Sequence, residues 1–329
     1  MMDVAVFGAG RMGKVHAMNV AKHPAARVKY VIDVMETAAR EVAASVGGQV
    51  GTLEQVLADK DVKAVVITSP TATHLPLSVA CARAGKAIFC EKPIDLSLDK
   101  VVECVAEVEK CKVPFQLGFQ RRFDPTFRAL YQQVAAGAIG DVEVVRVTSR
   151  DPYPPPRGYV ASSGGLFRDM MIHDFDIARW FLGEEPTEVY AVGSALVSPM
   201  FAELNDADTA IVVLKTASGK LCHIDNSRRA VYGYDQRIEV LGSKGMLQAG
   251  NRTPTTTLLW NETGIVADKI HPFFPERYSE AYAAEIAAFV DAIVAGKAPE
   301  VGADAGHKSL VLADAATQSW KLGQPVKIG

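Results

Sequence analysis

Short apolar runs alternate with amphipathic stretches over the first 120 residues of the chain. The runs predict strands at residues 4–7, 28–32, 64–67, 87–90 and 115–118. The run at 64–67 is apolar throughout, as expected of a parallel strand that is buried on both faces. The stretches between the runs have helical periodicity, at residues 12–21, 38–46, 75–84 and 98–110. Strands that alternate with helices predict a doubly wound parallel sheet, so we expect residues 1–120 to form an α/β domain.

The pattern changes to strands joined by tight turns in the rest of the chain. Strands are predicted at residues 142–149, 187–197, 209–216, 220–227 and 237–242. Ser218-Gly219 is a turn signal between two of them and indicates an antiparallel sheet. Helices are predicted at residues 125–136, 166–182, 279–295 and 303–322. Residues 121–329 are therefore expected to form a second domain of the α+β class.

Composition and charge narrow the class of protein. About half of the 329 residues are hydrophobic and 22% are charged, which is the balance of an ordinary globular enzyme. The net charge is −3 without a basic run, which argues against nucleic acid or an anionic membrane as a partner. No apolar stretch approaches the roughly 20 residues that span a bilayer. The five cysteines form no C-x-x-C pair, so we expect reduced thiols in a cytoplasmic protein.

A glycine-rich segment joins the first strand to the first helix. It has the form G-x-G-x-x-G and consists of Gly8, Ala9, Gly10, Arg11, Met12 and Gly13. Gly8 permits the turn, Gly10 lets a pyrophosphate approach the backbone, and Gly13 lets the helix pack on the strand. The helix N-terminus, with Arg11 and Met12, offers unpaired N–H groups to phosphates. The alternative is a glycine turn that binds no phosphate.

Asp33 ends the second strand, 20 residues after Gly13. An acidic residue at this place accepts hydrogen bonds from the adenine-ribose hydroxyls of a dinucleotide. Its charge would repel the 2′-phosphate of NADP, and Val34 beside it supplies no compensating cation. Strand, loop, helix and acid together predict NAD as the cofactor, against the alternative of a surface aspartate.

Lys92 follows the strand at residues 87–90 and so lies at the carboxyl edge of the sheet, where open α/β folds bind ligands. A lysine there can donate a hydrogen bond to a substrate oxygen and stabilise a developing alkoxide. Position alone explains Lys92 equally well as a surface lysine at the end of a strand.

The predicted helix at residues 166–182 is apolar nearly all round, with one polar stripe. Asp169, His173 and Asp176 fall at positions i, i+4 and i+7 of this helix. An imidazole beside a carboxylate is the usual arrangement of a general base, which makes Asp169 and His173 candidates for catalysis. The alternatives are a satisfied Asp–His pair in the core and a salt bridge from Asp176 to Arg179.

A metal site is the competing interpretation of this stripe, because His173, Asp174 and Asp176 could all be ligands. However, residues at positions i and i+1 of a helix point in different directions. No second histidine follows at i+4 to complete a zinc pair. We therefore expect no metal.

These segments together resemble the family of glucose–fructose oxidoreductase and inositol dehydrogenase over essentially the whole chain. The resemblance is carried by residues 8–13, 68–74, 91–93 and 118–124 and by the segment of Asp169 and His173. Within the family, residues 121–124 and 232–235 resemble those of bacterial inositol dehydrogenases. The resemblance implies a Rossmann domain followed by an open-faced antiparallel sheet, a homotetramer, and catalysis by Lys92, Asp169 and His173.

The resemblance also implies further contacts. The residues expected beside the cofactor are Ser69, Pro70, Glu91 and Lys92. The residues expected to contact the substrate are Gln120, Arg121, Asp151 and Tyr234, together with Asp169 and His173. The bond between Lys92 and Pro93 is often cis in such enzymes.

The function expected from these residues is NAD-dependent oxidation of a ring hydroxyl of a cyclic polyol, with myo-inositol converted to 2-keto-myo-inositol. A dehydrogenase of another sugar, such as glucose or xylose, is the alternative on the same scaffold. A dinucleotide sensor that regulates a partner is the alternative from another class. A sensor would be expected to lack the lysine or the histidine, and Lys92 and His173 are both present.

Overall fold

The computed structural model describes residues 1–329, which form two compact units. The first unit consists of Met1–Phe123 and Ala281–Leu310, and the second of Asp124–Glu280 and Val311–Gly329. The division expected after residue 120 treats the domains as two continuous segments. In the structure, the chain instead returns to the first unit after residue 280. None of the helices combines the length and the apolar character needed to cross a membrane.

The first unit contains a six-stranded parallel sheet with the order β3-β2-β1-β4-β5-β6. Its strands are β1 (Met2–Phe7), β2 (Ala26–Ile32), β3 (Gln49–Val50), β4 (Val62–Ile67), β5 (Ala87–Glu91) and β6 (Phe115–Gly118). Its helices before residue 124 are α1 (Arg11–Lys22), α2 (Glu36–Val46), α3 (Leu53–Ala58), η1 (Thr71–Thr73), α4 (His74–Arg83), α5 (Leu98–Cys111) and η2 (Gln120–Phe123). The predicted doubly wound sheet is confirmed. The strand order reverses between β1 and β4, and ligands bind at the carboxyl ends of such strands.

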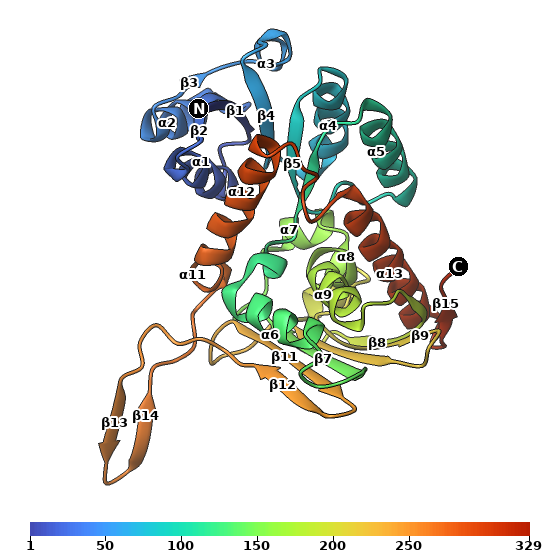
Figure 1. The fold of residues 1–329 in the computed structure, drawn as a ribbon. Coiled ribbons are helices and arrows are strands. Elements are labelled where there is room, and N and C mark those ends of the chain that lie inside the picture. Colours follow the sequence, from blue (N-terminus) through green and yellow to red (C-terminus); the bar gives the residue numbers. More distant parts are fainter. The chain divides into compact units, whose positions relative to one another are not determined.

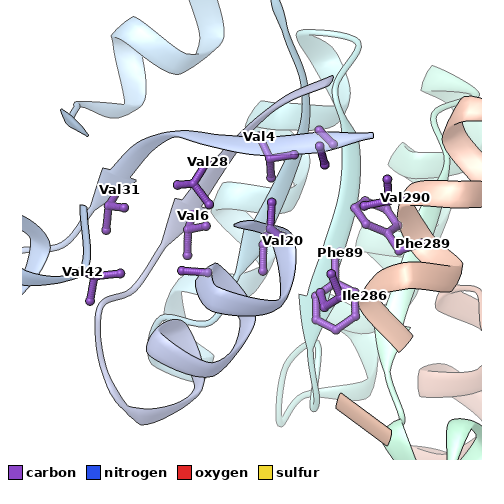
Figure 2. Packing of buried hydrophobic residues seen from close by; sticks show 14 of the residues in the cluster. Val4, Val6, Val20, Val28, Val31, Val42, Phe89, Ile286, Phe289 and Val290 are labelled. Carbon is purple, nitrogen blue, oxygen red and sulfur yellow. The ribbon is translucent and has the colours of Figure 1, made fainter. Parts of the chain in front are cut away.

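The core of the first unit explains why the chain returns to it. Helix α12 (Ser279–Val294) presents Ile286, Phe289 and Val290 to this core, and all three side chains are fully buried. Figure 2 shows them beside Phe89 of β5. Full burial of an aliphatic or aromatic side chain contributes about 1.5–3 kcal/mol. The predicted helix at residues 279–295 could not reveal this packing, because the packing depends on contacts with strands far away in sequence.

The second unit contains a seven-stranded sheet with the order β12-β11-β7-β10-β9-β8-β15 (Figure 1). Its strands are β7 (Val142–Arg150), β8 (Pro186–Ser194), β9 (Thr209–Thr216), β10 (Leu221–Ser227), β11 (Asp235–Gly242), β12 (Gly245–Ala249) and β15 (Val326–Lys327). The expectation of a purely antiparallel sheet is wrong for one pair, because β10 runs parallel to β7. The long crossover between β7 and β8 permits this, since only neighbours joined by tight turns must be antiparallel.

Helices cover one face of the second sheet and leave the other open. The helices of this unit are α6 (Pro125–Ala135), α7 (Arg157–Ser162), α8 (Gly165–Asp169), α9 (Ile172–Leu182), α10 (Pro199–Glu203) and α11 (Phe274–Arg277), together with α13 (Ala303–Leu322) from Val311 onward. Side chains alternate along β9, where Val212 and Leu214 are buried and Ile211 and Val213 are exposed. A hairpin of β13 (Leu258–Asn261) and β14 (Gly264–Ala267) extends away from this sheet with every residue exposed (Figure 1).

Candidate active site

The residues assigned to the site by sequence divide between the two units. Those of the first unit are Gly8, Gly10, Arg11, Met12, Gly13, Asp33, Ser69, Pro70, Glu91, Lys92, Gln120 and Arg121. Those of the second unit are Asp151, Asp169, His173 and Tyr234. The first set contains the expected cofactor residues, and the second contains the expected acid–base pair.

The glycine-rich loop between β1 and α1 has the geometry of a phosphate cradle. Gly8 has a φ of +100°, and a Cβ on it would lie 2.7 Å from the backbone nitrogen of Ser69. A Cβ on Gly13 would lie 1.9 Å from the carbonyl oxygen of Gly8, so only glycine fits there. Around Gly10, in contrast, nothing lies within 4 Å of an added Cβ, and no side chain caps α1. The N–H groups at the start of α1 are therefore open to an anion, which fits the pyrophosphate of NAD.

Asp33 fastens the loop to the end of β2. Its Oδ2 accepts a hydrogen bond from the backbone N–H of Ala9 at 2.7 Å, and its Oδ1 accepts one from Met35 at 2.8 Å. Each carboxylate oxygen has further lone pairs that can accept hydrogen bonds from ribose hydroxyls. Val34 beside it is fully exposed and carries no charge that would neutralise a 2′-phosphate.

Two loops at the carboxyl edge of the sheet are joined by His74, the first residue of α4. Its Nε2 lies 2.7 Å from the carbonyl oxygen of Ser69, in the loop after β4. Its Nδ1 lies 2.7 Å from the carbonyl oxygen of Pro93, in the loop after β5. The ring is 2% exposed. The expected cofactor residues Ser69 and Pro70 are thereby connected to the segment that carries Lys92.

Glu91 is the last residue of β5 and has a partner on each carboxylate oxygen. His16 of α1 places its Nε2 2.7 Å from Oε1, and the backbone N–H of Lys92 donates to Oε2 at 3.2 Å. The peptide bond between Lys92 and Pro93 is cis, as the family resemblance implied. Gly118 of β6 makes room for this carboxylate, because a Cβ there would lie 3.1 Å from Oε2.

A second carboxylate, that of Glu285 in α12, lies beside His16. Its Oε1 is 3.8 Å from Nε2 of His16, and neither oxygen of Glu285 has a hydrogen-bond partner. Burial, followed by the nearby charge of Glu91, raises the pKa of Glu285 well above its ordinary value. These three side chains have the spacing of a metal site, with their ligand atoms within 4.8 Å of one another. In the structure, His16 and Glu91 are joined by a hydrogen bond, and the Glu285 carboxyl lies beyond hydrogen-bond distance of His16.

In the second unit, the parallel pairing of β7 and β10 brings together a carboxylate and a guanidinium. Ser227 at the end of β10 lies opposite Arg150 at the end of β7, so the next residues along, Arg228 and Asp151, are neighbours. The Arg228 guanidinium donates from Nη1 to Oδ2 of Asp151 at 2.9 Å. The position of Asp151 at the end of a strand is therefore fixed by an ion pair.

Asp169 is bound by two residues that the sequence analysis did not assign to the site. The hydroxyl of Tyr159 donates to its Oδ1 at 2.7 Å, and Arg228 donates from Nη2 to its Oδ2 at 2.8 Å. Burial by itself lowers the pKa of Arg228, but the charges of Asp169 and Asp151 outweigh it and raise the pKa. The permanent cation stabilises both carboxylates as anions.

The single helix predicted at residues 166–182 is wrong. The structure has two helices, α8 and α9, that are separated at Met170 and Met171. The N–H of Met171 bonds to the carbonyl of Leu166, five residues earlier, which widens the turn and shifts the helical register. Asp169 therefore ends one helix and His173 lies in the first turn of the next. Their pairing as base and orienting acid stays a prediction.

The comparisons with known proteins agree with this geometry. Residues 2–119 match the model of the oxidoreductase family with an NAD-binding Rossmann fold, and residues 127–248 match the GFO/IDH/MocA C-terminal domain. The chain belongs to the GFO/IDH/MocA oxidoreductase family. It is therefore an NAD-dependent oxidoreductase, as the loop and Asp33 predicted.

Members of the GFO/IDH/MocA family that resemble the chain do so over nearly their full length. Inositol 2-dehydrogenase of Rhizobium meliloti is 48% identical over 95% of both chains. The solved myo-inositol dehydrogenase of Corynebacterium glutamicum is 42% identical, with a TM-score of 0.96 over 100% of this chain and 99% of that one. The scyllo-inositol dehydrogenase of Lactobacillus casei, solved with NAD(H) and scyllo-inositol, is 30% identical with a TM-score of 0.91 over 100% and 98%.

Three further residues that were assigned to the substrate are buried in the structure. Gln120 and Arg121 lie in η2, directly after β6, and both are buried. Tyr234 precedes β11, and its ring packs edge-on against Phe273 and Tyr278 at 5.7 and 5.9 Å. Their contacts with a substrate stay predictions.

Two acidic residues close to His173 in sequence have partners within the second unit. Asp176 lies 3.8 Å from Arg179, as the salt-bridge alternative proposed. Asp174 accepts a hydrogen bond from Asn226 at 2.9 Å. Both side chains are buried and contact these partners, so each has a structural role in the core.

Proposed function

We propose that this family member oxidises myo-inositol to 2-keto-myo-inositol with NAD⁺. The observation that carries the proposal is the 48% identity with an inositol 2-dehydrogenase over 95% of both chains. The two carboxylates held by Arg228 supply acceptors for hydroxyl groups, as a ring with a hydroxyl on every carbon requires.

The proposed reaction removes a hydride and a proton from one secondary alcohol. Bound NAD⁺ supplies the electrophilic carbon that accepts the hydride. His173 takes the hydroxyl proton as general base, which contributes roughly a hundred- to ten-thousand-fold in rate. Asp169 stabilises the imidazolium that forms, and its own negative charge is maintained by Arg228 and the hydroxyl of Tyr159. Lys92 orients the substrate oxygen, and the ketone is the product.

The remaining ring hydroxyls are assigned to four residues. These are Gln120, Arg121, Asp151 and Tyr234. A buried polar group left without a partner costs about 1–3 kcal/mol, so an apolar alcohol would be a poor substrate. An aldose ring presents hydroxyls in a similar pattern and is the competing substrate class.

The test is a panel of substrates with NAD⁺, in which NADH formation is followed by absorbance. We expect kcat/KM for myo-inositol to exceed the values for glucose and xylose by more than about tenfold, with scyllo-inositol and D-chiro-inositol in between. An aldose that surpasses every inositol by that factor would replace the proposal with a sugar dehydrogenase. If no polyol or sugar is oxidised while NADH still binds, the chain is a dinucleotide sensor.

We further propose that the protein is a homotetramer in the cytoplasm. The open face of the second sheet exposes apolar side chains on adjacent strands, among them Val192, Ile211, Val213 and Leu221. Another copy of the chain that covers this face would remove them from water. Sedimentation equilibrium measures the assembly. The cytoplasmic location is supported by the five cysteines, all of which are free thiols.

A further inference from the structure

Each neighbour of Lys92 in the chain is held by a buried histidine from another element. Glu91, which precedes it, contacts His16 of α1, and Pro93, which follows it, contacts His74 of α4; both distances are 2.7 Å. His16 is fully buried and His74 is 2% exposed. No part of the reaction described above uses either ring.

His74 makes one contact with each of two loops. Its two ring nitrogens lie 2.7 Å from backbone carbonyl oxygens, those of Ser69 and Pro93. The ring therefore ties the loop after β4 to the loop after β5.

On the other side of Lys92, the hydrogen bond from His16 holds Glu91 in place. Its Nε2 donates to Oε1 of Glu91, while Oε2 of the same carboxylate accepts the backbone N–H of Lys92. The ring of His16 is itself held by packing against Phe89 and Tyr282, with centroid distances of 4.9 and 5.8 Å. A chain of contacts therefore runs from the core of the first unit to the backbone of Lys92.

We propose that His74 and His16 are positioning residues that set the place of Lys92 through Pro93 and Glu91. The inference rests on the proposed function, in which Lys92 orients the reacting oxygen. A displacement of about 1 Å in such a group can cost on the order of a hundredfold in rate. The bond to Ser69 instead positions the loop after β4, which carries the expected cofactor residues Ser69 and Pro70. The two bonds of His74 therefore have separable effects.

Asparagine and glutamine variants separate these bonds, because the amide of asparagine replaces Nδ1 of a histidine and that of glutamine replaces Nε2. H74Q keeps the bond to Ser69 and loses the bond to Pro93. We expect its kcat to fall about tenfold or more with KM for NAD⁺ changed less than about twofold. H74N loses the bond to Ser69 instead, and its main effect is a higher KM for NAD⁺. H23Q, a change to a histidine paired with the exposed Asp291, is the matched control and leaves both parameters unchanged.

The His16 variants give an independent test, in which glutamine should preserve kcat and asparagine should lower it. H16Q retains a donor for Glu91 and keeps most of kcat, whereas H16N loses the donor and lowers kcat about tenfold. Thermal unfolding and NADH fluorescence titrations establish that each variant is folded and binds cofactor. Equal kcat values for H74Q, H16N and the wild type would overturn the inference.

A double-mutant comparison shows whether the histidines act through Lys92. In a K92A background, H74Q should lower kcat by less than about twofold, because the group it positions is gone. A full additional tenfold loss would contradict positioning. An unchanged kcat in K92A alone would contradict the proposed role of Lys92 and remove the basis of the inference, whereas a large loss in K92A with no loss in H74Q overturns only the inference.

Discussion

The two sets of site residues are built by different means. In the first unit, the expected cofactor residues follow strands β1, β2, β4 and β5, and backbone groups make many of the contacts there. Asp33 accepts hydrogen bonds from two N–H groups, and the neighbouring His74 contacts two carbonyl oxygens. In the second unit, Asp151 and Asp169 are held by side chains, and one guanidinium serves both. The first set is thus fixed by fold topology and the second by a charge network.

This difference has consequences for tolerance to mutation. Where backbone groups make the contacts, few side chains matter and those that do are glycines or charges at defined strand ends. Where one buried cation serves two anions, removal of the cation leaves both carboxylates without compensation, at about 3–5 kcal/mol for a broken buried pair. We therefore expect the proposed catalytic residues of the second unit to act together.

The largest effect is expected in that second set. H173A should lower kcat by about a hundredfold or more, because the general base is lost, and D169A should do likewise. The double variant should cost little beyond H173A alone, since Asp169 acts on the imidazole. Steady-state kinetics measures all three. Near-normal turnover in H173A would mean that the base lies elsewhere, and additive losses would mean that Asp169 acts independently of His173.

Substitution at Asp33, in the first unit, is expected to change the cofactor preference rather than to abolish activity. In the variant with D33S and V34R, the charge that repels a 2′-phosphate is gone and a cation is present. We expect the ratio of kcat/KM for NAD⁺ to that for NADP⁺ to fall by about tenfold or more, with the second unit unaffected. A wild type that uses both cofactors equally well would contradict the role of Asp33.

A smaller effect is expected from Glu285 in helix α12. Burial raises its pKa, so the folded protein keeps a proton that the unfolded chain releases above the ordinary value of 4.5. Stability therefore decreases as pH rises above that value, by about 1.4 kcal/mol per pH unit until the folded pKa is reached. E285Q has no such loss, so its free energy of unfolding relative to wild type should increase between pH 5 and 7.

Urea unfolding at several pH values measures this difference, and E109Q, a change at an exposed helix position, is the control. The E109Q protein should follow the wild type at every pH. A difference between E285Q and wild type that does not change with pH would show that Glu285 is ionised in the folded protein.

The parallel sheet and the NAD cofactor of the first unit could be predicted because their signals are local. The glycine loop, its helix and Asp33 lie within 26 residues, and each has a fixed place in a β-α-β unit. Helix α12 was assigned to the other domain because its apolar face alone does not specify which core it enters.

The second set was only partly predictable, for a reason visible in two residues. Arg228 is 77 residues from Asp151, and they meet because β10 runs parallel to β7, where the turn signals indicated antiparallel strands. Tyr159 reaches Asp169 from a short helix after a proline-rich loop, which no periodicity marked. The same applies to His16 and His74. His16 falls within a predicted helix and His74 directly precedes one, and their carboxylate and carbonyl partners could not be read from the sequence.

We propose that this protein transfers a hydride from C2 of myo-inositol to NAD⁺. The most direct measurement uses myo-inositol with deuterium at C2 and identifies the label in the reduced cofactor by NMR or mass spectrometry. We expect the deuterium at C4 of the nicotinamide, with one equivalent of 2-keto-myo-inositol formed for each reduced cofactor. Unlabelled NADH, which would mean oxidation at another carbon, or the absence of any reduction would contradict the proposed reaction.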